Sequence, residues 1–189
     1  VTNPATLSGA GAAGNTDVVS GATFDAGTYD LSETGGPAGY TASAWVCVGG
    51  TQVDGDTVTI ALGENVTCTI TNNDNPTTLT LVKTLVNDNG GTNIIADWAL
   101  TADGNPFTSG VSQNVTPDTY TLTESGPSGY TASAWVCVGG SQTGSDITLA
   151  LGENATCTIT NDDTSATLTL QKTVVNDNGG SATNANFTP

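Results

Sequence analysis

The chain has 189 residues, with 18 acidic residues against two lysines, no arginine and no histidine, giving a formal net charge of −16. This charge argues against a nucleic-acid partner, whose phosphates require lysine and arginine, and against binding to anionic lipid. No apolar run reaches the ~20 residues of a membrane-spanning helix, so we expect no membrane insertion.

The chain contains an internal repeat with a period close to ninety residues. The segment Gly39–Gly50 recurs unchanged as Gly129–Gly140, and the lysine-containing segment Thr80–Gly91 recurs closely as Thr169–Gly180. Both lysines therefore occupy the same register. This period is too long for a solenoid and indicates an array of small domains.

The register of the repeat divides the chain into three parts. Residues 1–75, the N-terminal body, lack a lysine strand, whereas residues 76–164, the middle domain, hold a complete copy. Residues 165–189, the tail, are a lysine strand without a body. Placing the tail ahead of the N-terminal body rebuilds one full domain, so one domain is split across the chain ends. Either the chain is one period of a longer polypeptide, or its tail completes the first domain of the next subunit.

Short runs rich in Thr, Val, Ile, Leu and Tyr alternate apolar with polar residues between turn-forming residues, which is typical of β-strands. No segment has a helical period. We therefore expect an all-β protein made of tandem immunoglobulin-like β-sandwiches. The expected strands of the middle domain are Thr78 to Val86, Thr119 to Glu124, Tyr130 to Val138, Asp146 to Leu151 and Ala155 to Asn161.

Four cysteines fall as two matched pairs, one in each copy. Cys47 and Cys68 lie in the N-terminal body, and Cys137 and Cys157 lie in the middle domain. Free buried thiols are the alternative, but the matched positions and the absence of CxxC spacing or histidine favour one disulfide in each copy. Disulfides indicate an oxidising environment, so we expect an extracellular or cell-surface protein.

Polar residues interrupt the apolar faces of three strands in each copy. Side chains along a strand alternate between its two faces, so Lys83 shares its face with Leu79 and Leu81. Isolated buried charges are expensive, so these polar residues are expected to meet in the interior. The sets are Lys83, Glu124 and Asn161 in the middle domain, and Lys172, Glu33 and Asn72 in the split domain.

The segments Tyr120–Tyr130 and Tyr29–Tyr40 resemble the Tyr-x-Leu-x-Glu…Pro-x-Gly-Tyr motif of Cna-B domains. These domains, also called SpaA-like or prealbumin-like, build stalks and pilins of bacterial surface proteins. The resemblance covers essentially the whole chain. Two departures from the family pattern are the cysteine pair in each copy and the first domain's missing lysine strand.

The resemblance implies an intramolecular isopeptide bond in each domain. In this family a lysine of an early strand is joined to an asparagine of the last strand, with the assistance of a glutamate. By position, Glu124 would assist the Lys83–Asn161 bond and Glu33 would assist the Lys172–Asn72 bond. The alternative is a hydrogen-bonded cluster without a crosslink. If the tail belongs to a neighbouring subunit, the second bond would join two molecules.

Weaker signals concern ions and aromatic residues. The loops Asn87–Gly91 and Asn176–Gly180 are rich in oxygen ligands for calcium, but the same residues form ordinary turns, which we favour. We therefore expect no cofactor and assign no metal ligand. Trp98 and Phe107 lack counterparts in the N-terminal body and are expected at the surface or at a domain junction.

Taken together, these features predict a structural subunit or repeat unit of an extracellular filament, pilus or adhesin stalk. Its expected partners are copies of itself in a head-to-tail homopolymer. Without histidine, no ordinary Ser–His or Cys–His pair exists, so no turnover enzyme is expected beyond single-turnover isopeptide formation. The alternative is an adhesin module that recognises a glycan or host protein, with calcium as a conceivable requirement.

Overall fold

A computed structural model describes residues 24–187 of the chain. The described chain forms two compact units. The first contains residues up to Thr78 together with Asn114–Asp118 and Thr148–Asn154. The second contains Leu79–Gln113, Thr119–Ile147 and the residues from Ala155 onward. The first 23 residues of the expected N-terminal body lie outside the described residues.

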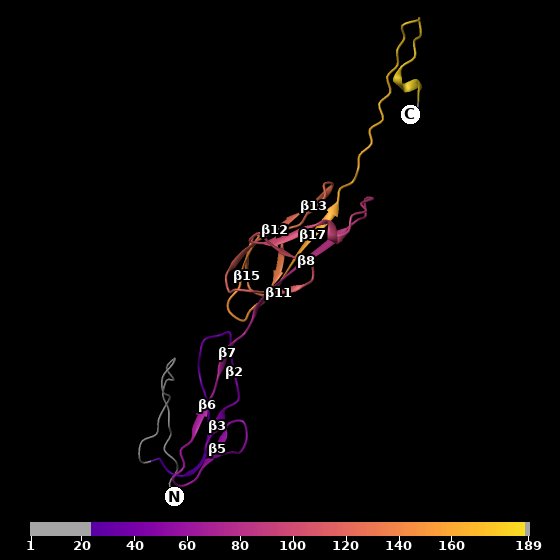
Figure 1. Ribbon diagram of the computed structural model, residues 1–189. Coiled ribbons are helices and arrows are strands. Elements are labelled where there is room, and N and C mark those ends of the chain that lie inside the picture. The colour runs from indigo at the N-terminus through magenta and orange to yellow at the C-terminus, as the bar shows by residue number, and fades with distance from the viewer. Residues whose placement is uncertain (1–23, 188–189) are drawn as a thin grey trace. The chain divides into compact units, whose positions relative to one another are not determined.

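The N-terminal body consists of short antiparallel strand pairs. β1 and β4 flank β5 in one sheet, while β2 pairs with β7 and β3 pairs with β6 (Figure 1). The strands are β1 (Gly27–Asp30), β2 (Tyr40–Ala42), β3 (Val46–Val48), β4 (Thr51–Gln52), β5 (Thr57–Ile60), β6 (Thr67–Thr69) and β7 (Asn72–Asp74).

The middle domain contains two five-stranded sheets. One has the order β10-β9-β12-β16-β15, and the other has the order β11-β8-β17-β13, with β14 also paired to β17. Its elements are β8 (Thr77–Val86), η1 (Ile95–Asp97), β9 (Ala99–Ala102), β10 (Asn105–Phe107), β11 (Ser112–Val115), β12 (Thr119–Ser125), β13 (Tyr130–Ala132), β14 (Val136–Val138), β15 (Ser141–Thr143), β16 (Asp146–Thr148) and β17 (Asn154–Asp163).

The two long strands of the middle domain, β8 and β17, are adjacent and run parallel. Thr78 contacts the side chain of Asn154, and further along both strands Thr84 contacts Thr160. The residue number increases in the same direction along both strands, so the two strands are parallel. Their side chains alternate between buried and more exposed positions, as the period of two requires.

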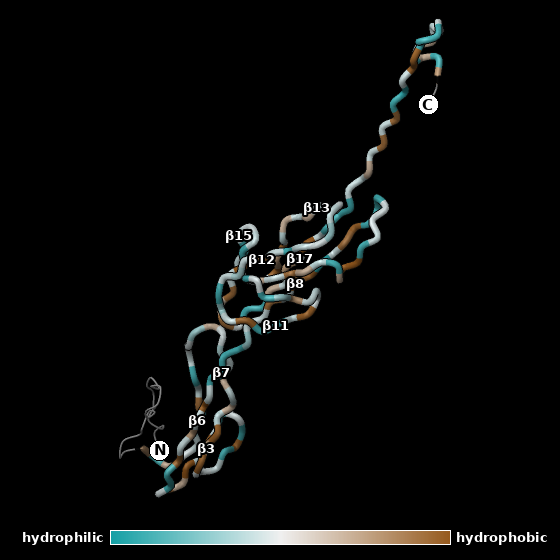
Figure 2. Tube along the Cα trace, turned by 45° about the horizontal axis from the view of Figure 1, so that its top comes forward, coloured by the Kyte–Doolittle hydropathy of each residue, from teal (hydrophilic) through white to brown (hydrophobic). Residues whose placement is uncertain are grey.

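The core of the middle domain is formed by the inward-facing residues of both sheets. Leu79 and Leu81 of β8 have no exposed surface, and Ile147 of β16 is equally enclosed. The expectation of an all-β fold is correct; the only helical elements among residues 24–187 are the 3₁₀ turns η1 and η2 (Asn184–Asn186). Figure 2 shows brown, hydrophobic stretches interspersed with white and teal ones along the chain, the strands included.

Two expected strands differ from those observed. The segment Tyr130 to Val138 forms two strands, because Ser133 interrupts it with a side-chain hydrogen bond from the backbone N–H of Thr160. The strand expected to reach Leu151 ends at Thr148, and a turn follows in which the Glu153 carboxylate accepts a hydrogen bond from the backbone N–H of Ala150.

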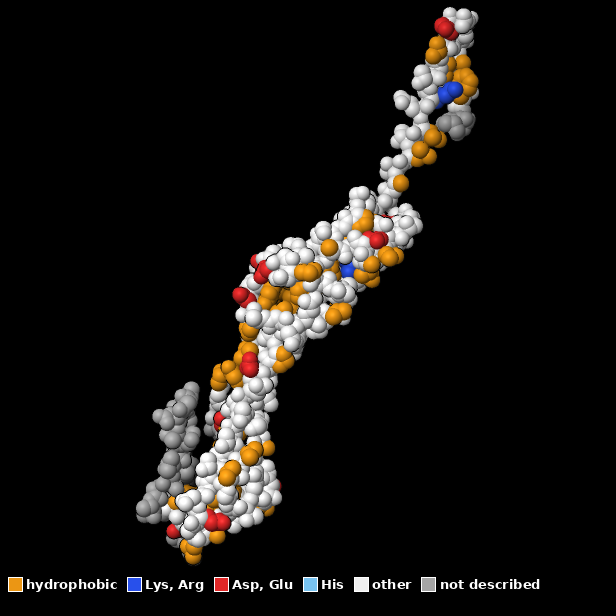
Figure 3. All heavy atoms as spheres, in the orientation of Figure 1, with side chains coloured by type: hydrophobic (Ala, Val, Ile, Leu, Met, Phe, Trp, Pro, Cys, Tyr) orange, Lys and Arg blue, Asp and Glu red, His pale blue; other side chains and the backbone are white. Residues whose placement is uncertain are grey.

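The tail forms no β-strand within the described chain and is drawn as an extended trace at the yellow end of Figure 1. Its apolar side chains are exposed: Leu168 has 84% of its surface accessible and Leu170 has 67%. Their counterparts Leu79 and Leu81 are fully buried. Hydrophobic side chains along this segment are visible in Figure 3.

Both cysteine pairs form disulfides. Cys47 is bonded to Cys68 and Cys137 to Cys157, and in each case the two residues lie directly opposite on antiparallel strands. Within the described residues, no helix is long and apolar enough to cross a bilayer.

Removing the second disulfide should destabilise the middle domain. The bond closes a segment with a sequence separation of 20 residues. In the chain-entropy model a loop of this size contributes about 3 kcal/mol. We expect the double variant Cys137→Ser/Cys157→Ser to lose about this much free energy of unfolding, measured by denaturant titration. An unchanged midpoint would mean that the disulfide does not restrict the unfolded chain.

Candidate functional site

The interior of the middle domain contains a lysine, a glutamate and an asparagine in mutual contact. Lys83 Nζ lies 2.7 Å from Glu124 Oε2, and the Asn161 side-chain amide donates a 2.8 Å hydrogen bond to Glu124 Oε1. Lys83 projects from β8, Glu124 from β12 and Asn161 from β17. The glutamate therefore bridges the lysine and asparagine, which lie on the two adjacent parallel strands.

This cluster is enclosed. Only 2% of the surface of Lys83 and 4% of that of Asn161 are exposed. The Lys83 amine lies 5.0 Å from the ring centroid of Trp98, a distance typical of a cation–π interaction. The ring requires a glycine at position 126, since a Cβ there would lie 2.3 Å from a Trp98 atom. Trp98 and Phe107 are thus buried, and their expected surface role is wrong.

The asparagine amide presents its nitrogen to the glutamate. Glu124 accepts a hydrogen bond from the amide nitrogen of Asn161 and makes none with its carbonyl oxygen. Among the described residues, Asn161 Oδ1 has no hydrogen-bond partner. An ionised carboxylate can only accept hydrogen bonds, so it selects the N–H side of the amide.

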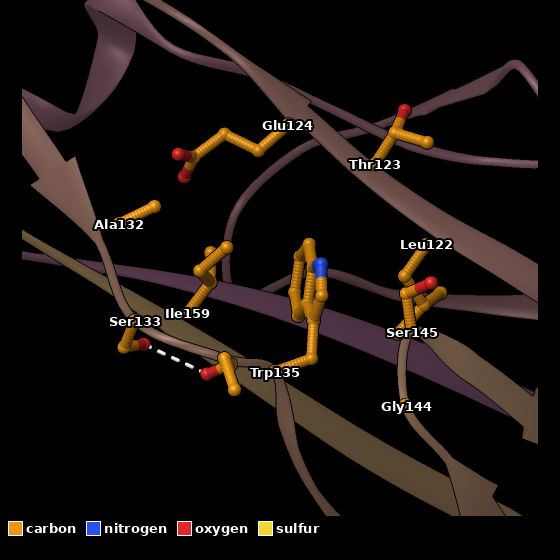
Figure 4. A pocket seen from close by; sticks show the side chains of 10 residues that line it. Leu122, Thr123, Glu124, Ala132, Ser133, Trp135, Gly144, Ser145 and Ile159 are labelled. Carbon is orange, nitrogen blue, oxygen red and sulfur yellow. Dashed lines mark hydrogen bonds between the residues drawn. The ribbon is translucent and has the colours of Figure 1, made fainter.

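A hollow on the middle domain reaches the glutamate. It is lined by Glu124 and Leu122 of β12, by Trp135 in the β13–β14 connection and by Ile159 of β17 (Figure 4). The Lys83 side chain is fully buried, whereas that of Glu124 is 8% exposed. The Glu124 side chain is therefore more exposed than that of Lys83.

The N-terminal body contains two of the same three residues. The side-chain amide of Asn72 donates a 2.7 Å hydrogen bond to Glu33 Oε1, matching the contact between Asn161 and Glu124. Unlike their counterparts, Glu33 and Asn72 are exposed. We call this pair the half-site, because no lysine belongs to it in this part of the chain.

The third residue of the split set lies in the tail. Lys172 is exposed, and its amine lies 4.6 Å from the ring centroid of Phe187. Phe187 follows Lys172 by the same number of residues as Trp98 follows Lys83. The tail therefore reproduces the lysine–aromatic contact of the middle domain by itself. This shared spacing is the sequence signal that would have placed Trp98 beside the lysine.

A second buried acid, Asp163 at the end of β17, holds the loop that follows the lysine strand. Its carboxylate accepts hydrogen bonds from the backbone N–H groups of Asp88 at 2.9 Å, Asn89 at 3.0 Å and Gly91 at 2.5 Å. We call this arrangement the carboxylate clasp. It requires glycine at position 91, where a Cβ would lie 2.9 Å from the Asp163 side chain.

The clasp bears on the two interpretations of the Asn87–Gly91 loop, the turn that we favour and the calcium loop. Asp88, Asp162 and Asp163 lie close enough to form a small acidic cluster. However, the loop directs N–H donors at Asp163, and donors bind an anion and not a cation. Burial alone would raise the pKa of Asp163, but the hydrogen bonds from Gly91, Asn89 and Asp88 outweigh it and hold the pKa below its ordinary value of 3.8.

The lowered pKa of Asp163 makes the clasp sensitive to acid. Its contribution to stability should be complete above about pH 4 and be lost as the pH falls through the lowered folded pKa. We expect Asp163→Asn to destabilise the middle domain at neutral pH, with a deficit that shrinks on acidification because the native side chain becomes protonated. Thermal unfolding between neutral and strongly acidic pH measures this difference.

The neighbouring Asp162→Asn is the matched control, since Asp162 is exposed and carries the same charge. It should have little effect at any pH. A deficit of Asp163→Asn that stays constant down to strongly acidic pH would contradict a role for the ionised carboxylate.

Comparison with known proteins places the chain in a family. A family model described as a prealbumin-like fold domain matches residues 1–70, 74–159 and 163–189. No curated protein and no solved structure gives a significant match. Three observations indicate the same family. They are the all-β fold of the middle domain, the repeated motif around Glu33 and Glu124, and the match over nearly the whole length of the chain. The chain belongs to the SpaA-like family of prealbumin-like fold domains.

Proposed function

We propose that this chain is a structural subunit or repeat unit of an extracellular filament, pilus or adhesin stalk, in which domains are joined head to tail. The observation that carries the proposal is the distribution of the two three-residue sets. The middle domain holds Lys83, Glu124 and Asn161 together, whereas the half-site and Lys172 belong to different parts of the chain. Lys172 of the tail is thus the residue type that the half-site lacks.

The exposed tail supports assembly through strand complementation. Leu168 and Leu170 match residues that are fully buried in β8 of the middle domain, and exposing such side chains to water is unfavourable. On the other side, the described strands β6 and β7 of the N-terminal body each pair with one strand only, while β17 pairs on both edges. The family model also matches the tail as a separate segment.

We further propose that the cluster of the middle domain forms a covalent bond. Transfer of a proton from Lys83 Nζ to Glu124 leaves a neutral amine, which attacks Cγ of Asn161. The Nζ–Cγ bond forms, and the Cγ–Nδ2 bond breaks. Glu124 passes its proton to the departing nitrogen, which leaves as ammonia, and the Glu124 carboxylate then accepts the second proton lost by Nζ and ends protonated. The enclosed geometry supplies the orientation for this single turnover.

The setting of this reaction is an oxidising one outside the cytoplasm. The disulfides Cys47–Cys68 and Cys137–Cys157 support an extracellular or cell-surface location, where such bonds persist. A scaffold function also fits the close matching of the copies, because a stalk lengthens by repeating one unit. The protein would act on no substrate other than itself.

Intact mass tests the covalent step. If the bond forms, the purified chain should be lighter than its sequence by one ammonia, after allowance for the disulfides. Glu124→Gln removes the proton acceptor, so this variant should keep the full mass. Peptide mapping should join fragments containing Lys83 and Asn161 only in the native chain.

The matched control is Glu33→Gln, which alters the equivalent glutamate of the half-site. In the single chain this variant should lose one ammonia, as the native chain does. A native chain with full mass would refute the isopeptide bond and leave a hydrogen-bonded cluster held by the Lys83–Glu124 ion pair.

A further inference from the structure

The loop at 176–180 of the tail has the same local structure as the 87–91 loop, which the carboxylate clasp binds in the middle domain. In both segments a first asparagine donates to a backbone carbonyl six residues later, Asn87 to Asn93 and Asn176 to Ala182. The side-chain amide of Asn178 bonds to Asp177 as that of Asn89 bonds to Asp88. Within residues 24–187, the loop at 176–180 is therefore formed without a counterpart of the Asp163 carboxylate.

The carboxylate that is missing from the tail has a counterpart in the N-terminal body. Asp74 stands two residues after Asn72, as Asp163 stands two residues after Asn161. Asp163 is only 6% exposed and bound by three backbone N–H groups, whereas Asp74 at the end of β7 is exposed.

We propose that Asp74 of one copy binds the backbone N–H groups of residues 177, 178 and 180 of a second copy. This intermolecular clasp would reproduce the contacts of Asp163 with the 88–91 loop. The inference rests on the proposed head-to-tail function and adds to it a non-covalent docking site distinct from the half-site. Its occupant is the tail of another copy, because the tail carries the matching loop, lysine and aromatic residue.

The charges around Asp74 favour this pairing. In the middle domain, the clasp brings together three carboxylates, those of Asp88, Asp162 and Asp163. The counterpart of Asp162 in the N-terminal body is Asn73, so an intermolecular clasp would contain one carboxylate fewer. Two copies that each carry a net charge of −16 repel each other, and this replacement removes one local source of repulsion.

A tyrosine provides a second contact at the same place. Tyr130 packs edge-on against Trp98 with ring centroids 5.1 Å apart, and its hydroxyl donates a 2.8 Å hydrogen bond to Asn87. Its counterpart Tyr40 is 46% exposed. In the docked tail, Phe187 would occupy the place of Trp98. The clasp and this aromatic contact would fix the register in which Lys172 meets the half-site.

Glycine 180 gives a specific test of the clasp. In the tail, a Cβ at this position would meet only the end of the Asn176 side chain, at 2.9 Å. At the equivalent Gly91, a Cβ would lie 2.3 Å from the Tyr130 hydroxyl and 2.9 Å from Asp163. Gly180→Ala should therefore leave the free chain folded and obstruct docking on a second copy.

The experiment measures self-association of the full chain by sedimentation, in an Asn72→Ala background that cannot form the covalent link. Adding Asp74→Asn or Gly180→Ala should raise the concentration for half-association by about tenfold or more, the loss expected for hydrogen bonds to a charged group. Asp56→Asn removes the same charge from an exposed loop of the N-terminal body and is expected to leave association unchanged.

Each other outcome overturns a defined part of the proposal. Association that neither Asp74→Asn nor Gly180→Ala weakens would overturn the clasp and leave head-to-tail assembly intact. No association of the native chain would overturn the proposed function together with the clasp. Association of the native chain but not of the Asn72→Ala background would overturn the clasp as a docking site distinct from the half-site and leave head-to-tail assembly intact. A monomer whose 176–180 amides are protected from hydrogen exchange, with protection lost in Asp74→Asn, would place the clasp within one chain and exclude the second copy.

Discussion

The middle domain is organised around the amine of Lys83, which is buried in the apolar core between its two sheets. A buried charge without a partner costs several kcal/mol, so Lys83 requires both a carboxylate within bonding distance and an aromatic face beside it. Glu124 supplies the first and Trp98 the second. Placing that ring in turn requires a residue without a side chain at position 126. Much of the repeated motif can therefore be explained by the burial of the Lys83 side chain.

The split copy separates this arrangement into two parts that each keep their local structure. The Glu33–Asn72 hydrogen bond forms without a lysine, and the Lys172–Phe187 contact forms without a glutamate. In the proposed assembly both parts would therefore be organised before they meet, which would lower the conformational entropy that association must overcome. Apolar side chains such as Leu168 are exposed in the single chain.

Much of this structure could be predicted from the sequence, because its main signals are local or repeated. The period of two along Thr77–Val86 placed Lys83 on the buried face, and the matched spacing of the cysteines indicated the two pairs. The carboxylate clasp could not be predicted, because the Asn87–Gly91 loop has no strand alternation that would point its groups toward Asp163. A tract of Asn, Asp and Gly does not reveal whether its oxygens or its N–H groups face inward.

The scarcity of lysine has a consequence for digestion. Proteases of trypsin specificity cut after lysine or arginine, and this chain offers them two peptide bonds, Lys83–Thr84 and Lys172–Thr173. The first lies within β8, between β11 and β17, and follows a side chain that is 2% exposed. Only the second is accessible in the folded single chain. A tail seated in another copy would hide that bond as well and leave the polymer without a cleavage point for such enzymes.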